Sequence, residues 1–298
     1  MKKIYIHILV FSFSLISCER ETDLNINSQT PKLVVDANIE NDLPPVVVLS
    51  ESFNYFSTIT PEEASGNFVH NAVVTVSDGS KTVTLKEYNF ADTSGYTFYY
   101  YGLNTVDPSQ LLYGKLNTAY TLTIKLDNGE EYKAAASIPA LRKTCDSLYW
   151  ITAPGNADTS RCVLYGYFTD PAGLGDYVRY FTSVNGGVYY PGYNSVFNDQ
   201  IVDGTSYTFQ IPRGFNKNDT AKLNSEDFGF FHRGDSVVFK FCNIDNATYT
   251  FWNTWEFSYQ SIGNPFSSPN KVIGNISNGA LGNFSGYAAQ YRSIIIPK

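Results

Sequence analysis

The 298-residue chain is poor in basic residues, histidine and cysteine. Its 21 lysines and arginines are outnumbered by 28 aspartates and glutamates, which gives a formal net charge of −7. No predicted helical stretch carries a basic stripe. Because nucleic-acid binding needs a concentrated positive surface to neutralise phosphates, we expect no nucleic-acid partner.

The sequence also lacks recognisable catalytic, cofactor and metal motifs. His70 and His232 are too few and too far apart for an obvious zinc site or a Ser-His-Asp arrangement. Gly173-Leu174-Gly175 has neither the third glycine nor the following helix of a dinucleotide site. The segment Asp170 to Asp176 could offer two carboxylates to calcium, but it lacks alternating oxygen ligands and Asp-Pro-x-Gly is a common turn. We therefore predict no catalytic residues, no cofactor and no metal.

Four cysteines are present, and the first of them belongs to an N-terminal signal. The remaining three, Cys145, Cys162 and Cys242, are an odd number for an oxidising compartment. Two interpretations stay open: three buried thiols, or one disulfide and one thiol. Neither predicts a catalytic thiol, since no histidine flanks any of the three.

The N-terminus has the pattern of a bacterial lipoprotein signal. Lys2 and Lys3 precede a mostly apolar run, Ile4 to Ile16, which is shorter than the roughly 20 residues of a membrane-spanning helix. The box Leu15-Ile16-Ser17-Cys18 predicts cleavage before Cys18 and acylation of that residue. Residues 1–17 are thus a signal peptide, and residues 18–30 form an acidic, flexible tether. We expect anchoring by lipid rather than a membrane span.

The composition of the rest indicates a mainly β protein. Tyrosine (23) and phenylalanine (21) are abundant, and many short segments alternate between apolar and polar residues. Asp78-Gly79 and Asp127-Asn128-Gly129 each join two such segments and predict hairpins, the second with a type I′ turn. Strand number and spacing within residues 31–140 are typical of an immunoglobulin-like β-sandwich.

A second β-rich domain is predicted over residues 141–298, with a boundary near residue 140. It contains one exception, Asp245 to Ile262, where Phe251, Trp252, Trp255 and Tyr259 recur at helical spacing. We therefore predict one amphipathic helix near residues 245–262, whose aromatic face packs against a sheet.

Several motifs follow one another along this second region in an order that resembles the domain-of-unknown-function (DUF) family 4249. They are Asp146-Ser147-Leu148, Asp170-Pro171 with Gly173 and Tyr177-Val178-Arg179-Tyr180, Gly234-Asp235-Ser236-Val237, Ile244-Asp245 with Tyr249 and Trp252, Asn264-Pro265-Phe266, and Gly274-Asn275-Ile276 with Asn278-Gly279-Ala280-Leu281-Gly282. The opening strands, Pro31 to Val35 and Pro44 to Ser50, fit the family too. Cys145 departs from it, since an aliphatic residue is more typical there.

The resemblance implies a Bacteroidota outer-membrane lipoprotein of a kind often encoded beside TonB-dependent transporters of the starch-utilisation type. The acidic residues after Cys18 resemble an export signal to the outer face of the outer membrane, with the periplasmic leaflet as the alternative. We expect a non-enzymatic accessory or binding lipoprotein and a partner of such a transporter barrel, with a glycan or peptide as possible ligand. The alternative is a lipid-tethered carbohydrate-active or peptide-cleaving enzyme.

Tyrosine clusters are the candidate contact residues. Tyr189, Tyr190 and Tyr193 fall close together in a strand-like region, where consecutive side chains point to both faces. Tyrosine is favoured at recognition surfaces because it joins a large apolar area to a hydroxyl group. The competing interpretation is that these rings simply pack in the sandwich.

Overall fold

A computed structural model describes residues 30–53, 60–91, 96–219, 223, 225–262, 264, 266 and 270–298. The predicted signal peptide, Cys18 and all of the predicted tether except Thr30 lie outside the described residues. Residues 31–298 form one compact unit.

The fold is mainly β, with 49% strand and 9% helix. The elements of the first half are β1 (Leu33–Glu40), β2 (Val46–Glu51), α2 (Pro61–Gly66), β3 (Val73–Ser77), β4 (Thr82–Ala91), β5 (Thr97–Leu103), the 3₁₀ helix η1 (Pro108–Gln110), β6 (Thr118–Lys125) and β7 (Glu131–Ile138). Those of the second half are β8 (Thr144–Thr152), β9 (Arg161–Thr169), β10 (Tyr177–Val184), β11 (Tyr190–Phe197), β12 (Ser206–Ile211), β13 (Phe231–His232), β14 (Ser236–Ile244), α3 (Asn246–Gln260) and β15 (Leu281–Ile295).

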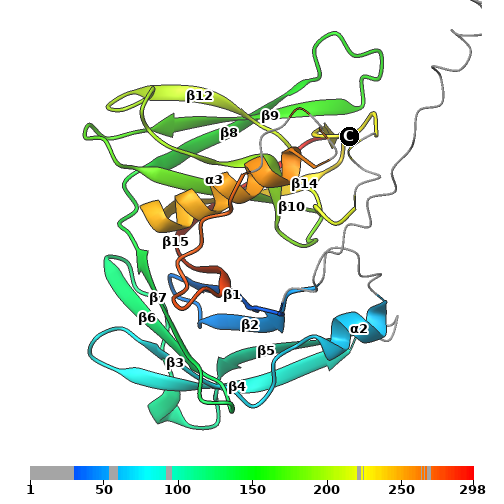
Figure 1. Ribbon diagram of the computed structural model, residues 1–298. Coiled ribbons are helices and arrows are strands. Elements are labelled where there is room, and N and C mark those ends of the chain that lie inside the picture. Colours follow the sequence, from blue (N-terminus) through cyan, green and yellow to red (C-terminus); the bar gives the residue numbers. More distant parts are fainter. Residues whose placement is uncertain are drawn as a thin grey trace, which may run out of the picture. The chain divides into compact units, whose positions relative to one another are not determined.

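The described strands form two sheets. One has 11 strands in the order β11-β10-β14-β15-β1-β2-β5-β4-β3-β6-β7, and in the other β9 pairs with β8, β12 and β13. The last strand, β15, lies between strands of the N-terminal and C-terminal halves of the chain. Its first half runs parallel to β1 and its second half antiparallel to β14 (Figure 1). The segments 31–140 and 141–298, predicted as two domains, therefore share one continuous sheet.

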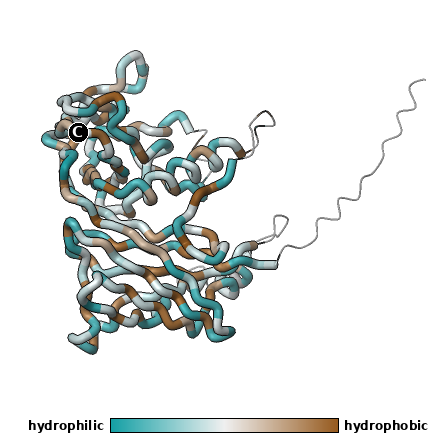
Figure 2. Tube along the Cα trace, turned by 60° about the vertical axis from the view of Figure 1, so that its left-hand side comes forward, coloured by the Kyte–Doolittle hydropathy of each residue, from teal (hydrophilic) through white to brown (hydrophobic). Residues whose placement is uncertain are grey.

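Three clusters of buried side chains hold the layers together. The first lies among β1 to β7 and includes Phe284 of β15, so this region is sandwich-like as predicted. The second fills the space between β10 and β14 on one side and β8, β9 and β12 on the other. The third lies between α3 and the opposite face of β10, β14 and β15. Figure 2 shows hydrophilic and hydrophobic residues interleaved along the chain.

Both predicted hairpins form, but one turn differs from the prediction. β3 pairs with β4 across Asp78-Gly79, and β6 pairs with β7 from Lys125 opposite Glu131. Of the residues in the second turn, Gly129 has a positive φ of 88° and Asn128 does not, so the predicted type I′ turn is wrong. The loop has an extra residue, and a glycine in the left-handed region then closes it.

The single long helix is where the sequence places it. The carboxylate of Asp245 accepts a hydrogen bond from the backbone N–H of Thr248 (2.8 Å) and thereby caps the first turn of α3. Its other oxygen accepts from the backbone N–H of Ser137 in β7 (2.8 Å), so one residue starts the helix and ties it to the sandwich.

Cys145, Cys162 and Cys242 are three free, buried thiols in the structure. Burial raises the pKa of the Cys145 and Cys242 thiols to about 12, so both stay protonated and unreactive at neutral pH. No helix among the described residues is long and apolar enough to cross a membrane.

Candidate functional site

The non-core face of β1 forms the floor of a cleft. Alternate residues of this strand from Leu33 to Ile39 are buried in the sandwich core. Since successive side chains of a strand point to opposite faces, Asp36, Asn38 and Glu40 face the other way. All three line a cleft of about 420 Å³.

Helix α3, the start of β11 and the loop after β12 form the facing walls. Trp252 and Trp255 of α3 line the cleft, together with residues 189–191 and 215–218. Figure 1 shows α3 lying over the sheet around β10, β14 and β15, which leaves β1 beside the helix rather than beneath it. A concave site of this volume, with aromatic walls and a few convergent polar groups, has the size and chemistry of a small-ligand pocket.

Arg179 of β10 is the central cation of the cleft and is held on three sides. Its guanidinium carbon lies 3.4 Å from the centre of the Trp252 ring. Nε donates to Ser195 Oγ (3.3 Å), and Nη1 donates to the Tyr287 hydroxyl (2.8 Å). The side chain is therefore fixed by stacking and hydrogen bonds, and no described carboxylate forms an ion pair with it.

Glu256 anchors α3 to the rest of the site. It is 3% exposed and accepts hydrogen bonds from Ser195 N–H (2.9 Å), Ser195 O–H (2.6 Å) and the Lys217 ammonium (3.1 Å). The Lys217 ammonium also lies near the rings of Trp255 and Tyr259. Burial lowers the pKa of Lys217, and the charge of Glu256 opposes this shift. The pair joins the helix, β11 and the loop after β12 into one rigid wall.

A second ion pair closes the other end of the cleft. The Lys240 ammonium of β14 pairs with Glu40, which also accepts from the Tyr291 hydroxyl. The aromatic rings of Phe181, Tyr189, Tyr287 and Tyr291 surround this ammonium at 5.3 to 5.9 Å. Both charges are thus satisfied within the protein.

Asp36 differs from the other carboxylates of the cleft. Its side chain is exposed to the cleft, and no described residue forms a hydrogen bond or an ion pair with it. The protein around the cleft floor raises the pKa of Asp36 by desolvation, and the positive charge of Arg179 partly opposes that shift. The floor therefore presents a free acceptor to whatever occupies the cleft.

The three tyrosines predicted as contact residues separate in the structure. Tyr189, 40% exposed, and Tyr190 line the cleft. The ring of Tyr193 instead packs against Phe215 (6.3 Å between ring centres) and Phe228 (6.0 Å). Two of the three therefore line the cleft, and the third packs against the loop that forms part of its wall.

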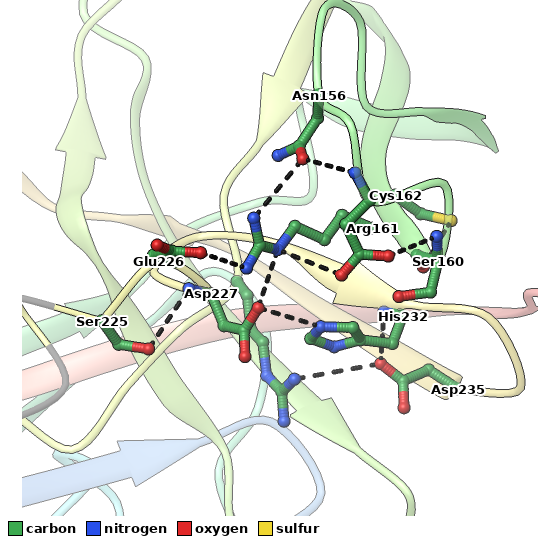
Figure 3. A network of polar contacts seen from close by, with 11 residues as sticks. Asn156, Ser160, Arg161, Cys162, Ser225, Glu226, Asp227, His232 and Asp235 are labelled. Atoms are coloured by element: carbon green, nitrogen blue, oxygen red, sulfur yellow. Dashed lines mark hydrogen bonds and ion pairs between the residues drawn. The ribbon is translucent and has the colours of Figure 1, made fainter.

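A neighbouring pocket of about 310 Å³ contains a histidine and a carboxylate. His232 Nε2 lies 3.3 Å from an Asp227 oxygen, which also accepts from Arg161 Nε at 2.8 Å (Figure 3). These bonds, that of Arg161 first, hold the pKa of Asp227 below its usual range. The hydroxyl of Ser225, next to this pair, accepts a hydrogen bond from the backbone N–H of Asp227 (3.2 Å).

The segment Asp170 to Asp176, which could have offered two carboxylates to calcium, uses both of them for ion pairs. Asp170 Oδ2 lies 3.0 Å from the Lys143 ammonium, with both side chains buried, and Asp176 pairs with Arg142. Among the described residues, no group of three or more histidine, cysteine, aspartate or glutamate side chains is arranged to hold a metal ion.

Four residues of the site were not predicted from the sequence: Asp36, Arg179, Lys217 and Glu256. The only available indication was the polar series Asp36, Asn38 and Glu40 on alternate positions of a strand, which also fits an ordinary solvent-facing strand. The other groups come together only when β10, α3 and the loop after β12 pack.

A comparison with curated proteins finds no match for the chain. A comparison with protein families finds one model that matches residues 19–293, almost the whole chain. The protein therefore belongs to the family described as Domain of unknown function (DUF4249).

Proposed function

We propose that the protein is a lipid-anchored binding protein of the outer membrane, facing the cell exterior and serving a TonB-dependent transporter of the starch-utilisation type. The lipoprotein box at Cys18 and the acidic tether support the anchoring. Membership of the family supports the location and the partner, through the resemblance described above.

One observation supports the binding role: internal ion pairs hold the walls of the cleft in place, whereas a charged group on its floor forms no such pair. Its walls are fixed by the pairs Lys217–Glu256 and Lys240–Glu40, whereas Asp36 on the floor has no partner among the described residues. A site that holds its walls in place and leaves a polar group free suits recognition of a ligand, because little ordering is needed on binding.

Anchoring would favour a membrane partner over a soluble one. A tether of roughly a dozen flexible residues confines the protein to the nearby surface and raises its effective concentration against a neighbouring barrel to about the millimolar range. Tyr189, exposed at the rim of the cleft, is the residue we assign to such a contact.

The second candidate is a lipid-tethered enzyme acting on glycans or peptides. The His232–Asp227 contact in the neighbouring pocket is the observation that favours it. The engagement of Asp227 by Arg161 weakens this candidate, because the carboxylate that would orient the histidine is already neutralised by an arginine.

The two candidates differ in what happens to a ligand. The full chain, extracted from membranes in mild detergent, should carry acyl mass on Cys18 and should bind glycans or peptides without converting them. Products that disappear in a His232→Ala variant would support the enzyme instead. A Cys18→Ala protein that stays in the membrane without acyl mass would remove the anchor from the proposal.

A further inference from the structure

Within the described part of the chain, two opposite charges of the cleft, those of Arg179 and Asp36, form no ion pair. Glu40 and Glu256 are satisfied by Lys240 and Lys217. Arg179 has no carboxylate within ion-pair distance among the described residues, and Asp36 has no cation. The two are nonetheless close enough for the charge of Arg179 to oppose part of the rise that desolvation causes in the pKa of the Asp36 carboxyl.

The orientation of Arg179 leaves one edge of its guanidinium group available to a ligand. Nε and Nη1 donate to Ser195 and Tyr287, and Trp252 stacks on the guanidinium plane. Nη2 donates to no described residue, and the side chain lines the cleft. An anionic group on the ligand would meet a fixed donor there, with the charge-assisted geometry that arginine offers to carboxylates.

The charge balance of the cleft restricts the ligand further. Among the described residues of the cleft, the two ion pairs, the Arg179 cation and the Asp36 carboxylate sum to zero charge, so a strongly charged ligand of either sign would leave one of these groups unmatched. A ligand that is neutral in sum but carries separated charges matches both free groups. Uncharged polyols would leave the charges of Asp36 and Arg179 partly desolvated and uncompensated.

We propose that the cleft binds a zwitterion of the α-amino acid type, with the ligand ammonium on Asp36 and the ligand carboxylate on Arg179. The side chain of the ligand then lies against the aromatic wall formed by Trp252 and Trp255. This proposal rests on the proposed binding function and names its ligand class. The volume of about 420 Å³ accommodates an amino acid with a large side chain or a short peptide.

The test uses the full chain in mild detergent and an acid hydrolysate of casein, a mixture of free amino acids, as the probe. Two further probes are the same hydrolysate with its amines acetylated and with its carboxyl groups methyl-esterified. A mixture of maltose and sucrose represents uncharged polyols. Because two of the three tryptophans, Trp252 and Trp255, line the cleft, tryptophan fluorescence reports occupancy, and calorimetry gives the affinity.

We expect the untreated hydrolysate to bind and both blocked hydrolysates to lose binding. Asp36→Asn should weaken binding by about ten- to a hundredfold, the loss of a charge-assisted hydrogen bond. Asp42→Asn is the matched control: Asp42 lies outside the cleft, and its φ of 64° suits asparagine. This control should bind like the wild type.

Three results would overturn the proposal: equal binding of the blocked and untreated hydrolysates, unchanged binding by Asp36→Asn, or no binding of any amino-acid probe. Binding of the polyols alone would also reject the zwitterion, yet it would leave the proposed binding function standing. The blocked probes decide the matter even if the variant fails to fold.

Discussion

Replacing Glu256 by glutamine tests whether the buried ion pair with Lys217 holds α3 on the sheet. The substitution keeps the size of the side chain but removes its charge. Three donors point at the two carboxylate oxygens of Glu256, two from Ser195 and one from Lys217. A glutamine offers one oxygen and one N–H₂ group, so at least one donor would face another donor.

The expected cost follows from burial. The Lys217 and Glu256 side chains are 9% and 4% exposed, and removing one partner of a buried pair costs about 3 to 5 kcal/mol because the other charge stays buried and unpaired. Urea unfolding followed by circular dichroism should show this loss as a lower midpoint with an unchanged slope. The loss is a large share of the 5 to 15 kcal/mol that is usual for folded proteins.

Two further variants distinguish the effect of the unpaired buried charge from a general loss of stability on substitution. Glu256→Gln combined with Lys217→Met removes both charges, and its loss should fall below about 2 kcal/mol. Glu226→Gln removes an 88% exposed carboxylate that pairs with Arg161, and it should unfold like the wild type. A Glu256→Gln protein within about 0.5 kcal/mol of the wild type would refute the reasoning.

Three other substitutions test the fold and the cleft floor. Asp245→Ala should cost about 1 to 2 kcal/mol in urea unfolding, since it removes the cap of α3 and the bond to Ser137, and Asp245→Asn should cost less. Gly286→Ala should lower the melting temperature strongly, because its new Cβ would lie 2.2 Å from the Ser137 carbonyl oxygen, whereas Gly66→Ala, with nothing within 4 Å, should not. Asp36→Asn should melt at or above the wild-type temperature at pH 7. Because the pKa of Asp36 is raised in the folded protein, the charged carboxylate destabilises the fold above that pKa. The gain in melting temperature should therefore vanish as the pH falls toward the ordinary pKa of 3.8. A gain in melting temperature that grows on acidification would contradict this.

The periodic parts of the structure were predictable from the sequence. The strands around Asp78-Gly79 and Asp127 to Gly129 alternate clearly, and the spacing of Phe251, Trp252 and Trp255 predicts α3 to within two residues at each end. These signals are local, because the alternation or spacing of apolar residues within one strand or helix reflects only which side of that element faces the core.

Features that depend on short local signals were harder to predict. The helix α2 was not predicted from the sequence, although Thr60 and Glu63 form a capping box that marks its start. The type I′ turn was wrong because Asn-Gly fits two loop lengths, and the strand register chose the longer one.

The candidate site could not be predicted because its parts lie far apart in the chain. Asp36 and Arg179 are 143 positions apart in the sequence (179 − 36), and they share a cleft because β15 pairs with β1 on one side and β14 on the other. A parallel pairing between the first and last strands leaves no sequence periodicity of its own. The role of Glu256 was hidden for a related reason: a glutamate on a helix is expected to face solvent.

Cross-linking in living cells, followed by purification of the full chain from the envelope, tests the central claim most directly. We expect a membrane barrel to co-purify in stoichiometric amount with a chain acylated at Cys18. Tyr189→Ser should weaken this association by about 2 kcal/mol or more, the threshold of a binding hot spot, and Tyr149→Ser, a substitution of similar exposure elsewhere, should not. A wild-type chain that purifies alone after cross-linking would contradict the account.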